Sequence, residues 1–120
     1  MSYDGALDPL GASQVVPYLI GLAARGVAIT LITFEKPERW AQADGRLAMQ
    51  RRLEACGIRW RPLRYHKWPR LAGTLRDIVA GSRAIACEAA RSAPALIHCR
   101  GDVATVMARW ARLPPAIRLL

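Results

Sequence analysis

Apolar residues recur along this chain with two different periods, and the periods predict alternating helices and strands. Short runs of β-forming apolar residues predict strands, whereas apolar stripes spaced three or four residues apart predict helices. Strands are expected over residues 27–34, 58–63, 95–99 and 116–120. Helices are expected over residues 13–25, 44–56, 71–91 and 102–112. Strict alternation of this kind predicts parallel strands joined by right-handed crossovers, with helices on both faces of a doubly wound α/β sheet.

Turn and cap residues refine these boundaries. Ser13 and Asp44 are suited to cap the first two helices. Gly26 is suited to end the first in the left-handed conformation, and Gly57 ends the second. Pro62 either makes the second strand an edge strand or ends it early. No linker divides the chain, so residues 1–120 are expected to form one domain.

The longest expected helix, 71–91, has its apolar residues at helical spacing. Its inward face is predicted to consist of Leu71, Leu75, Ile78, Ser82, Ile85 and Ala89, while Arg76, Arg83 and Arg91 face away.

Charge and cysteine content narrow the range of functions. The formal net charge of +9 and an isoelectric point near 10.7 favour an anionic partner, either nucleic acid, anionic lipid or a phosphorylated substrate. No signal peptide and no membrane span is readable, so a cytoplasmic location is expected. The widely separated Cys56, Cys87 and Cys99 are expected to be buried and reduced, and neither a disulfide framework nor a metal site is predicted.

Three segments are candidates for chemistry. The loop 5–13 opens a helix, and such a loop is either an ordinary surface loop or an anion site made of backbone N–H groups. It has neither a dinucleotide fingerprint nor a P-loop. The basic and aromatic segment 59–70 suits nucleic acid, a membrane surface or a lipid-linked phosphate, or is a solvated loop. The segment 97–101 brings His98 and Arg100 to the end of a strand, where open α/β sheets bind ligands.

The order and spacing of three motifs resemble the family 4 glycosyltransferases. The first is Ser-Tyr-Asp-Gly at 2–5, continuing through Gly-Ala-Ser-Gln-Val-Val-Pro-Tyr-Leu at 11–19. The second is the strand ending Ile-Thr-Phe-Glu-Lys-Pro at 32–37, and the third is Pro-Leu-Arg-Tyr-His-Lys at 62–67. A similar Ile-His-x-Arg segment lies at 97–100.

The resemblance implies a Rossmann-like domain on the acceptor side of a retaining, metal-independent glycosyltransferase. Residues 1–120 would be part of that N-terminal domain, without its first strand and without the domain that binds the nucleotide-sugar. The chain is therefore expected to be inactive alone, with no catalytic residue and no cofactor of its own. Its expected partners are a nucleotide-sugar and a carbohydrate or lipid-linked acceptor in the full-length enzyme, with peripheral contact to the inner face of the membrane and no specific nucleic acid.

The binding residues implied by the resemblance come from the three motif regions and the segment 97–101. They are Gly11, Ala12, Gln14, His66, Lys67, His98, Arg100 and Gly101. The family has a glycine pair where this chain has Gly11-Ala12, a departure that affects close backbone contact at position 12. Because each segment follows the end of a strand, Gly11, Arg100 and the His66-Lys67 pair are expected at one edge of the sheet.

The expected strand order is 58–63, 27–34, a gap left by the first strand, 95–99 and 116–120. Such a gap leaves two apolar strand edges without hydrogen-bond partners. Three alternative functions are a basic nucleic-acid-binding module, a Rossmann oxidoreductase domain and a non-catalytic α/β fragment. Steeply salt-dependent binding of DNA or RNA would indicate the first, and dinucleotide binding the second.

Overall fold

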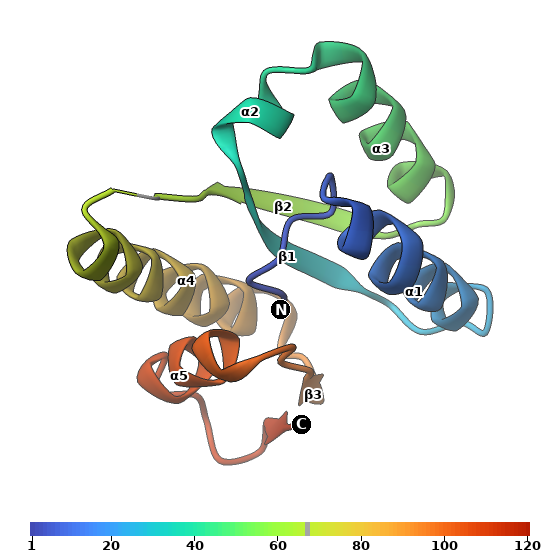
Figure 1. Ribbon diagram of the computed structural model, residues 1–120. Helices are drawn as coiled ribbons and strands as arrows, with labels where there is room; N and C mark the ends of the chain where they lie inside the picture. Colours follow the sequence, from blue (N-terminus) through green and yellow to red (C-terminus); the bar gives the residue numbers. More distant parts are fainter. Residues whose placement is uncertain (67) are drawn as a thin grey trace. The chain divides into compact units, whose positions relative to one another are not determined.

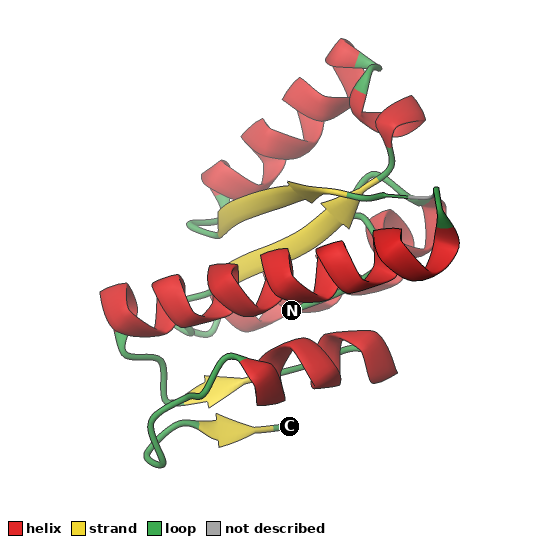
Figure 2. Ribbon diagram, turned by 90° about the vertical axis from the view of Figure 1, so that its left-hand side faces the viewer, coloured by secondary structure: helices red, strands yellow, loops and turns green. Residues whose placement is uncertain are grey.

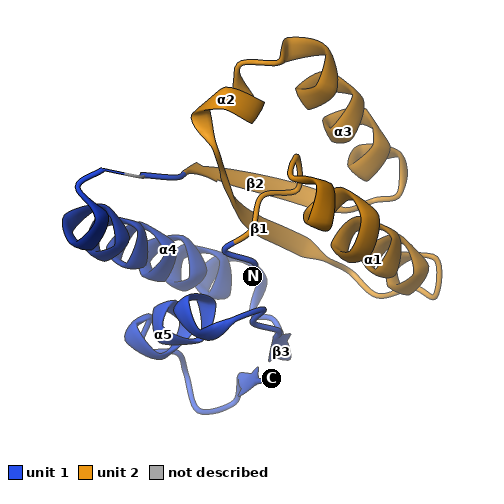
Figure 3. Ribbon diagram, viewed as in Figure 1, with its two compact units in different colours: residues 1–3, 65–120 blue, residues 4–64 orange. Residues whose placement is uncertain are grey.

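The computed structural model describes residues 1–66 and 68–120, which divide into two compact units (Figure 3). Unit 1 comprises Met1–Tyr3 and Tyr65–Leu120, and unit 2 comprises Asp4–Arg64. The elements of unit 2 are η1 (Gly11–Val15), α1 (Val16–Ala23), β1 (Thr30–Glu35), α2 (Pro37–Trp40), α3 (Ala43–Ala55) and β2 (Arg59–Arg64) (Figure 1). Those of unit 1 are α4 (Arg70–Ser92), β3 (Leu96–Ile97), α5 (Asp102–Trp110) and β4 (Arg118–Leu119).

Unit 2 is built on the parallel pair of β1 and β2, whose register runs from Thr30 opposite Arg59 to Glu35 opposite Arg64 (Figure 2). In β1 every residue after the first is buried, as the apolar residues at nearly every position of 27–34 predict. The core around it consists of Ala6, Val16, Leu31, Met49, Leu53 and Ile58. The strand begins three residues later than predicted, because Val27 is exposed and lies outside the ladder.

Both predicted helix caps are wrong, because each helix begins upstream of its expected cap. Ser13 lies within η1, and its hydroxyl donates a hydrogen bond of 2.6 Å to the carbonyl of Pro9. Asp44 lies in the first turn of α3. The predicted left-handed conformation of Gly26 is confirmed, with φ of +85°. Gly57, which was predicted to end the next helix, is also left-handed, with φ of +70°.

Strand β2 continues through Pro62 to Arg64. Among the described residues its only ladder is the one with β1. Of the two predictions for Pro62, the edge strand is therefore the one confirmed, because proline cannot donate to a second neighbour.

Unit 1 contains a second, shorter parallel pair, β3 and β4. The opposite edge of the β3 segment is occupied by the start of the chain: Arg100 N–H donates to the carbonyl of Met1 (2.9 Å), and Ser2 forms a parallel bridge with Arg100. The Met1 ammonium also donates to the carbonyl of His98 (2.6 Å). Burial lowers the pKa of that ammonium below its usual range.

The fold is therefore mixed α/β with two short parallel sheets. The predicted pairing of strand 27–34 with strand 58–63, and of strand 95–99 with strand 116–120, is confirmed. The expected open edge beside residues 95–99 is instead paired with Met1 and Ser2. Among the described residues, no helix is both long and apolar enough to cross a membrane.

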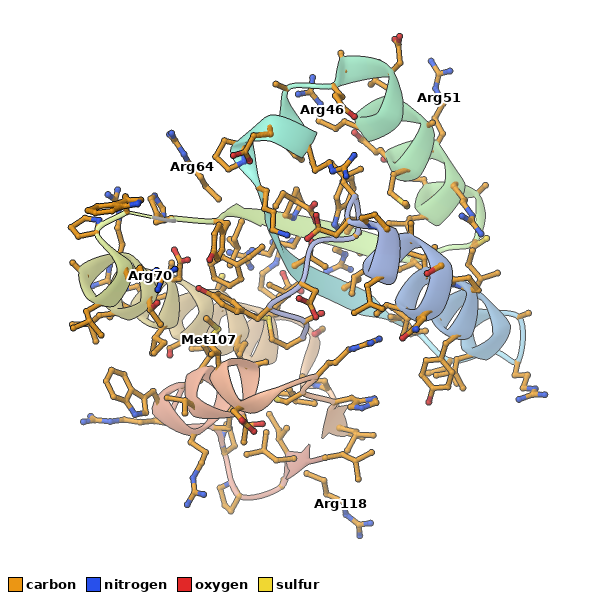
Figure 4. All side chains as sticks on the ribbon, in the orientation of Figure 1. Arg46, Arg51, Arg64, Arg70, Met107 and Arg118 are labelled. Atoms are coloured by element: carbon orange, nitrogen blue, oxygen red, sulfur yellow. The ribbon has the colours of Figure 1, made fainter. Side chains whose placement is uncertain are left out.

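Helix α4 buries the predicted face in its second half but not in its first. Leu71 is 89% exposed and Leu75 53% exposed, although both were expected to point inward. The first half of the helix instead buries Gly73, Asp77 and Gly81. Small residues are favoured there because α5 packs closely: the sulfur of Met107 lies where a side chain on Gly81 would be (Figure 4). Ser82, Ile85 and Ala89 are buried as predicted.

The cysteine prediction is only partly confirmed. All three cysteines are free thiols, but Cys87 is exposed and Cys56 and Cys99 are only half-buried. Burial raises the pKa of the Cys99 thiol, so Cys99 stays protonated at neutral pH.

Candidate functional site

A buried carboxylate at the carboxyl end of β1 anchors the loop that precedes η1. Glu35 Oε1 accepts hydrogen bonds from the backbone N–H of Ala6 (2.7 Å) and from the Thr33 hydroxyl (2.6 Å), and Oε2 accepts from the N–H of Leu7 (3.2 Å). The Thr33 hydroxyl in turn accepts from Trp60 Nε1 at 2.9 Å. Glu35 is 2% exposed, and these donors replace the water it has lost.

Glycines bring this loop close to the strand and to the helix. A Cβ on Gly5 would lie 2.5 Å from Glu35 Oε2, and a Cβ on Gly11 would overlap the carbonyl oxygen of Gly5. Ala12 packs its methyl against the core of unit 2. Gly11 thus has a packing reason to be glycine, and Ala12 fills space that glycine would leave empty.

Next to this anchor, Asp8 and Lys36 form an ion pair of 3.0 Å. The Asp8 side chain is 10% exposed, whereas that of Lys36 is 50% exposed. Two carboxylates thus attach the loop to the end of β1: Glu35 of the strand accepts from the loop, and Asp8 of the loop pairs with Lys36.

A pocket of about 440 Å³ opens at the carboxyl ends of β1 and β2. Its lining consists of Glu35, Pro37, Trp40, Ala41, Pro62, Leu63 and Arg64. The Trp40 ring is fixed by Trp60, edge-on with centroids 6.0 Å apart, and by the Arg46 guanidinium 4.9 Å from its centroid. The exposed Arg64 projects outward from the end of β2 (Figure 4).

A second buried carboxylate, in unit 1, holds two side chains as well as one backbone N–H. Asp77 is fully buried on α4. Its Oδ1 lies 2.6 Å from His66 Nδ1, and its Oδ2 accepts from the His66 N–H (3.1 Å) and the Tyr3 hydroxyl (3.1 Å). Tyr65 packs edge-on against Tyr3, with ring centroids 5.5 Å apart.

This arrangement fixes which ring nitrogen of His66 carries the proton. The Asp77 oxygens serve as acceptors, so Nδ1 is the donor and Nε2 of the neutral ring is left as an acceptor. Burial first, and then the negative charge of Asp77, raise the pKa of the Tyr3 phenol above its usual range, so Tyr3 remains a donor. The backbone approaches closely here too: a Cβ on Gly73 would lie 2.5 Å from the carbonyl of His66.

The binding residues implied by the resemblance are distributed over both units. Gly11, Ala12 and Gln14 belong to unit 2, with Gly11 buried and Gln14 exposed. His66, His98, Arg100 and Gly101 belong to unit 1, and Lys67 lies outside the described residues.

Within unit 1 the structure brings His98, Arg100 and Gly101 together at the end of β3, where the backbone turns into α5 with φ of +89° at Gly101. His98 is exposed, and its backbone carbonyl accepts from the chain's amino terminus. The expected meeting of Gly11 with Arg100 joins residues of different units and stays a prediction.

Three organising residues were missed by the sequence analysis: Glu35, Asp77 and Tyr3. Glu35 had a signal, because it is the one carboxylate in an otherwise uncharged strand. The signal for Asp77 was weaker. Glycines four residues before and after it indicate a closely packed helix face, and Asp77 lies on that face. Tyr3 had none, because its partner is 74 residues away.

Comparison of the chain with protein-family models, curated proteins and solved structures found no match. Among the described residues, no group of three or more histidine, cysteine or acidic side chains is placed to hold a metal ion.

Proposed function

We propose that this chain is the acceptor-side part of a retaining, metal-independent family 4 glycosyltransferase with a Rossmann-like, doubly wound sheet. It acts in the cytoplasm with a partner domain that binds the nucleotide-sugar, and it is inactive alone. Gly11, Ala12 and Gln14 face the donor, while His66, Lys67, His98, Arg100 and Gly101 serve the donor or the acceptor.

One observation carries the proposal: Glu35 joins two of the motifs on which the family resemblance rests. Its carboxylate belongs to the Ile-Thr-Phe-Glu-Lys-Pro motif, and its hydrogen bonds hold Ala6 and Leu7, between the two halves of the loop motif. Two motifs about thirty residues apart in the sequence are therefore joined by hydrogen bonds, and these bonds hold the loop against the end of β1. A loop fixed beside a strand's carboxyl end is where α/β proteins bind their ligands.

The pocket at the ends of β1 and β2 supports an acceptor of the carbohydrate class. Trp40 offers an apolar wall, and the exposed Arg64 offers a hydrogen-bonding group at its border. Sugars present both kinds of surface, because the C–H face of a pyranose is apolar and its edge carries hydroxyls. Ligand sites combine apolar lining with a few fixed polar groups in the same way.

Ligand-observed NMR of the chain tests the proposal. Saturation-transfer signals are expected from methyl pyranosides and none from uridine diphosphate, because the diphosphate is held by the partner domain. Transfer from a nucleotide-sugar by the isolated chain would contradict the proposal. So would salt-dependent binding of random duplex DNA without any saccharide binding, which would favour the nucleic-acid module.

In the complete two-domain enzyme, Arg100→Ala should lower sugar transfer without unfolding the protein, because it removes a cation suited to an anionic group. Arg109→Ala, at an exposed position on α5, is the matched control. Equal transfer by the two variants would remove Arg100 from the proposed site.

A second proposal, peripheral contact with an anionic membrane, rests on the exposed face of α4. Leu71, Leu75 and Val79 are exposed and spaced four residues apart, so they share one side of the helix. Trp68 just before the helix is 81% exposed, and Arg70 and Arg76 are exposed nearby. Aromatic and aliphatic groups beside arginines favour the interface of an anionic bilayer.

Co-sedimentation with vesicles tests this contact. The chain should bind vesicles containing phosphatidylglycerol and not pure phosphatidylcholine, and replacing both Leu71 and Leu75 with serine should reduce binding several-fold. Serine at Leu47, an exposed leucine on α3, is the control. Equal loss from both changes would contradict the assignment to α4.

A further inference from the structure

The cluster of Tyr3, His66 and Asp77 has the construction of a ligand-binding imidazole, not only of a structural hydrogen bond. Asp77 is fully buried, whereas the His66 side chain keeps 22% of its surface exposed. Among residues 1–66 and 68–120, the His66 ring is hydrogen-bonded through Nδ1 to Asp77, and no partner is found for Nε2. The cluster thus holds one nitrogen in the interior and leaves the other for something else to bind.

The two oxygens of Asp77 are used differently, and this fixes the chemistry of the ring. Oδ2 accepts from two donors, the Tyr3 hydroxyl and the His66 N–H, while Oδ1 is left for Nδ1. With Nδ1 as the donor, the neutral ring offers an Nε2 lone pair and no Nε2 proton. Such a nitrogen selects a ligand that donates, such as an alcohol O–H.

Aromatic side chains surround His66 in the sequence. Tyr65 precedes it and is half-buried against Tyr3, and Trp68 follows two residues later with 81% of its surface exposed. An exposed indole face matches the apolar C–H face of a pyranose, and the Nε2 acceptor matches a hydroxyl on its edge. Together they favour a saccharide over a purely anionic ligand, which would need the ring to be protonated.

We propose that His66 binds a saccharide hydroxyl through Nε2 as a hydrogen-bond acceptor, and that Asp77 and Tyr3 are positioning residues that hold the ring in this tautomer. The proposal rests on the proposed function for its ligand class, a carbohydrate acceptor. It specifies the polarity of the contact, with the ligand as donor and the protein as acceptor.

The tautomer is tested first, by two-bond ¹H–¹⁵N correlation NMR of the two histidines at a pH where they are neutral. His66 should show a protonated Nδ1 and a free Nε2. His98 is exposed and serves as the internal control, expected to favour the Nε2–H form of free histidine. A protonated Nε2 on His66 in the wild-type protein would overturn the proposal without any ligand being added.

Asp77→Asn should reverse the tautomer. The two donors at Oδ2 require the amide oxygen at that position, so the amide nitrogen faces Nδ1 and forces the proton onto Nε2. The wild-type protein should therefore prefer methyl pyranosides to their mono-O-methyl ethers at one ring position, because the ether has lost its donor. Asp77→Asn should lose that preference, which a purely structural role for Asp77 would not change.

His66→Asn removes Nε2 while keeping a side-chain N–H able to reach Asp77, so the buried carboxylate retains a donor. We expect it to weaken pyranoside binding at least several-fold, while Arg83→Ala, at an exposed position on α4, leaves binding unchanged. Unchanged binding by His66→Asn would overturn this inference and leave the proposed function standing. Absence of pyranoside binding by the wild-type chain would overturn both.

Discussion

Two buried carboxylates organise this protein, and they differ in what they hold. Glu35, in unit 2, accepts from two backbone N–H groups and from a threonine hydroxyl that is itself held by Trp60. Asp77, in unit 1, accepts from a tyrosine and from both the backbone and the ring of a histidine. Both carboxylates are buried and accept three hydrogen bonds, so their local energetics are similar.

The two networks differ in the groups that donate to each carboxylate. Around Glu35 the donors are backbone groups and a fixed hydroxyl, so the network ends in the fold itself. Around Asp77 one donor is the His66 imidazole, whose side chain is partly exposed. Its second nitrogen, Nε2, is not used by the network. A buried carboxylate with three donors therefore anchors a loop in one region and orients a partly exposed imidazole in the other.

If Glu35 is an anchor, removing its carboxylate should have the largest effect on stability. Glu35→Ala leaves the N–H groups of Ala6 and Leu7 and the Thr33 hydroxyl without their acceptor. At roughly 1–3 kcal/mol for each buried unsatisfied group, we expect a loss of about 4 kcal/mol in urea unfolding. Glu54→Ala, on an exposed turn of α3, should stay within about 0.5 kcal/mol. Similar losses from both would mean that Glu35 anchors nothing.

The loop held by Glu35 should also reject a side chain at Gly11. Gly11→Ala would press a methyl group into the carbonyl of Gly5 and cost about 2 kcal/mol by overpacking. Gly21→Ala meets nothing within 4 Å on the next helix and should stabilise the protein by about 0.5–1 kcal/mol. In thermal unfolding, Gly11→Ala should lower the melting temperature and Gly21→Ala should raise it. Shifts in the same direction would contradict the close packing of the loop at Gly11.

In the Asp77 network, Tyr3 provides a test that depends on pH. The raised pKa means that the folded protein keeps the phenolic proton at pH values where the unfolded chain has lost it. This contribution to the free energy of unfolding is present below a pH of about 10 and is lost as the pH rises above it. Tyr3→Phe should cost about 1 kcal/mol at neutral pH.

Tyr3→Phe should also flatten the alkaline decline of stability, measured by urea unfolding at several pH values. Tyr18→Phe removes an exposed tyrosine and should leave the decline unchanged. An alkaline decline that persists in Tyr3→Phe would show that the proton is held elsewhere.

The smallest effect is expected on the side of α4 that faces away from Asp77. Leu71→Ala should change the free energy of unfolding by less than about 0.5 kcal/mol, because the side chain is already exposed. Ile85→Ala, on the buried face, should cost about 2–4 kcal/mol. If chemical denaturation showed similar losses in the free energy of unfolding for Leu71→Ala and Ile85→Ala, α4 would not bury the face that carries Asp77.

The sequence by itself determined the order of the elements, because periodicity and glycine are local signals. The buried run of β1 and the left-handed Gly26 follow from neighbours along the chain. The two parallel strand pairs follow from the alternation of helices and strands. Local patterns failed where a distant partner decides: apolar spacing favoured Leu71 and Leu75 as the inner face of α4, but the close approach of Met107 selects the face of Gly81.

Only the tertiary structure identified the two carboxylates as organising centres. A charged residue is normally exposed, and burial becomes favourable only when several donors converge on it. For Glu35 those donors include residues 28 and 29 positions away, and for Asp77 one lies 74 positions away. Sequence motifs identified His66 as a candidate, but its tautomer depends on Asp77 and Tyr3, which only folding brings to it.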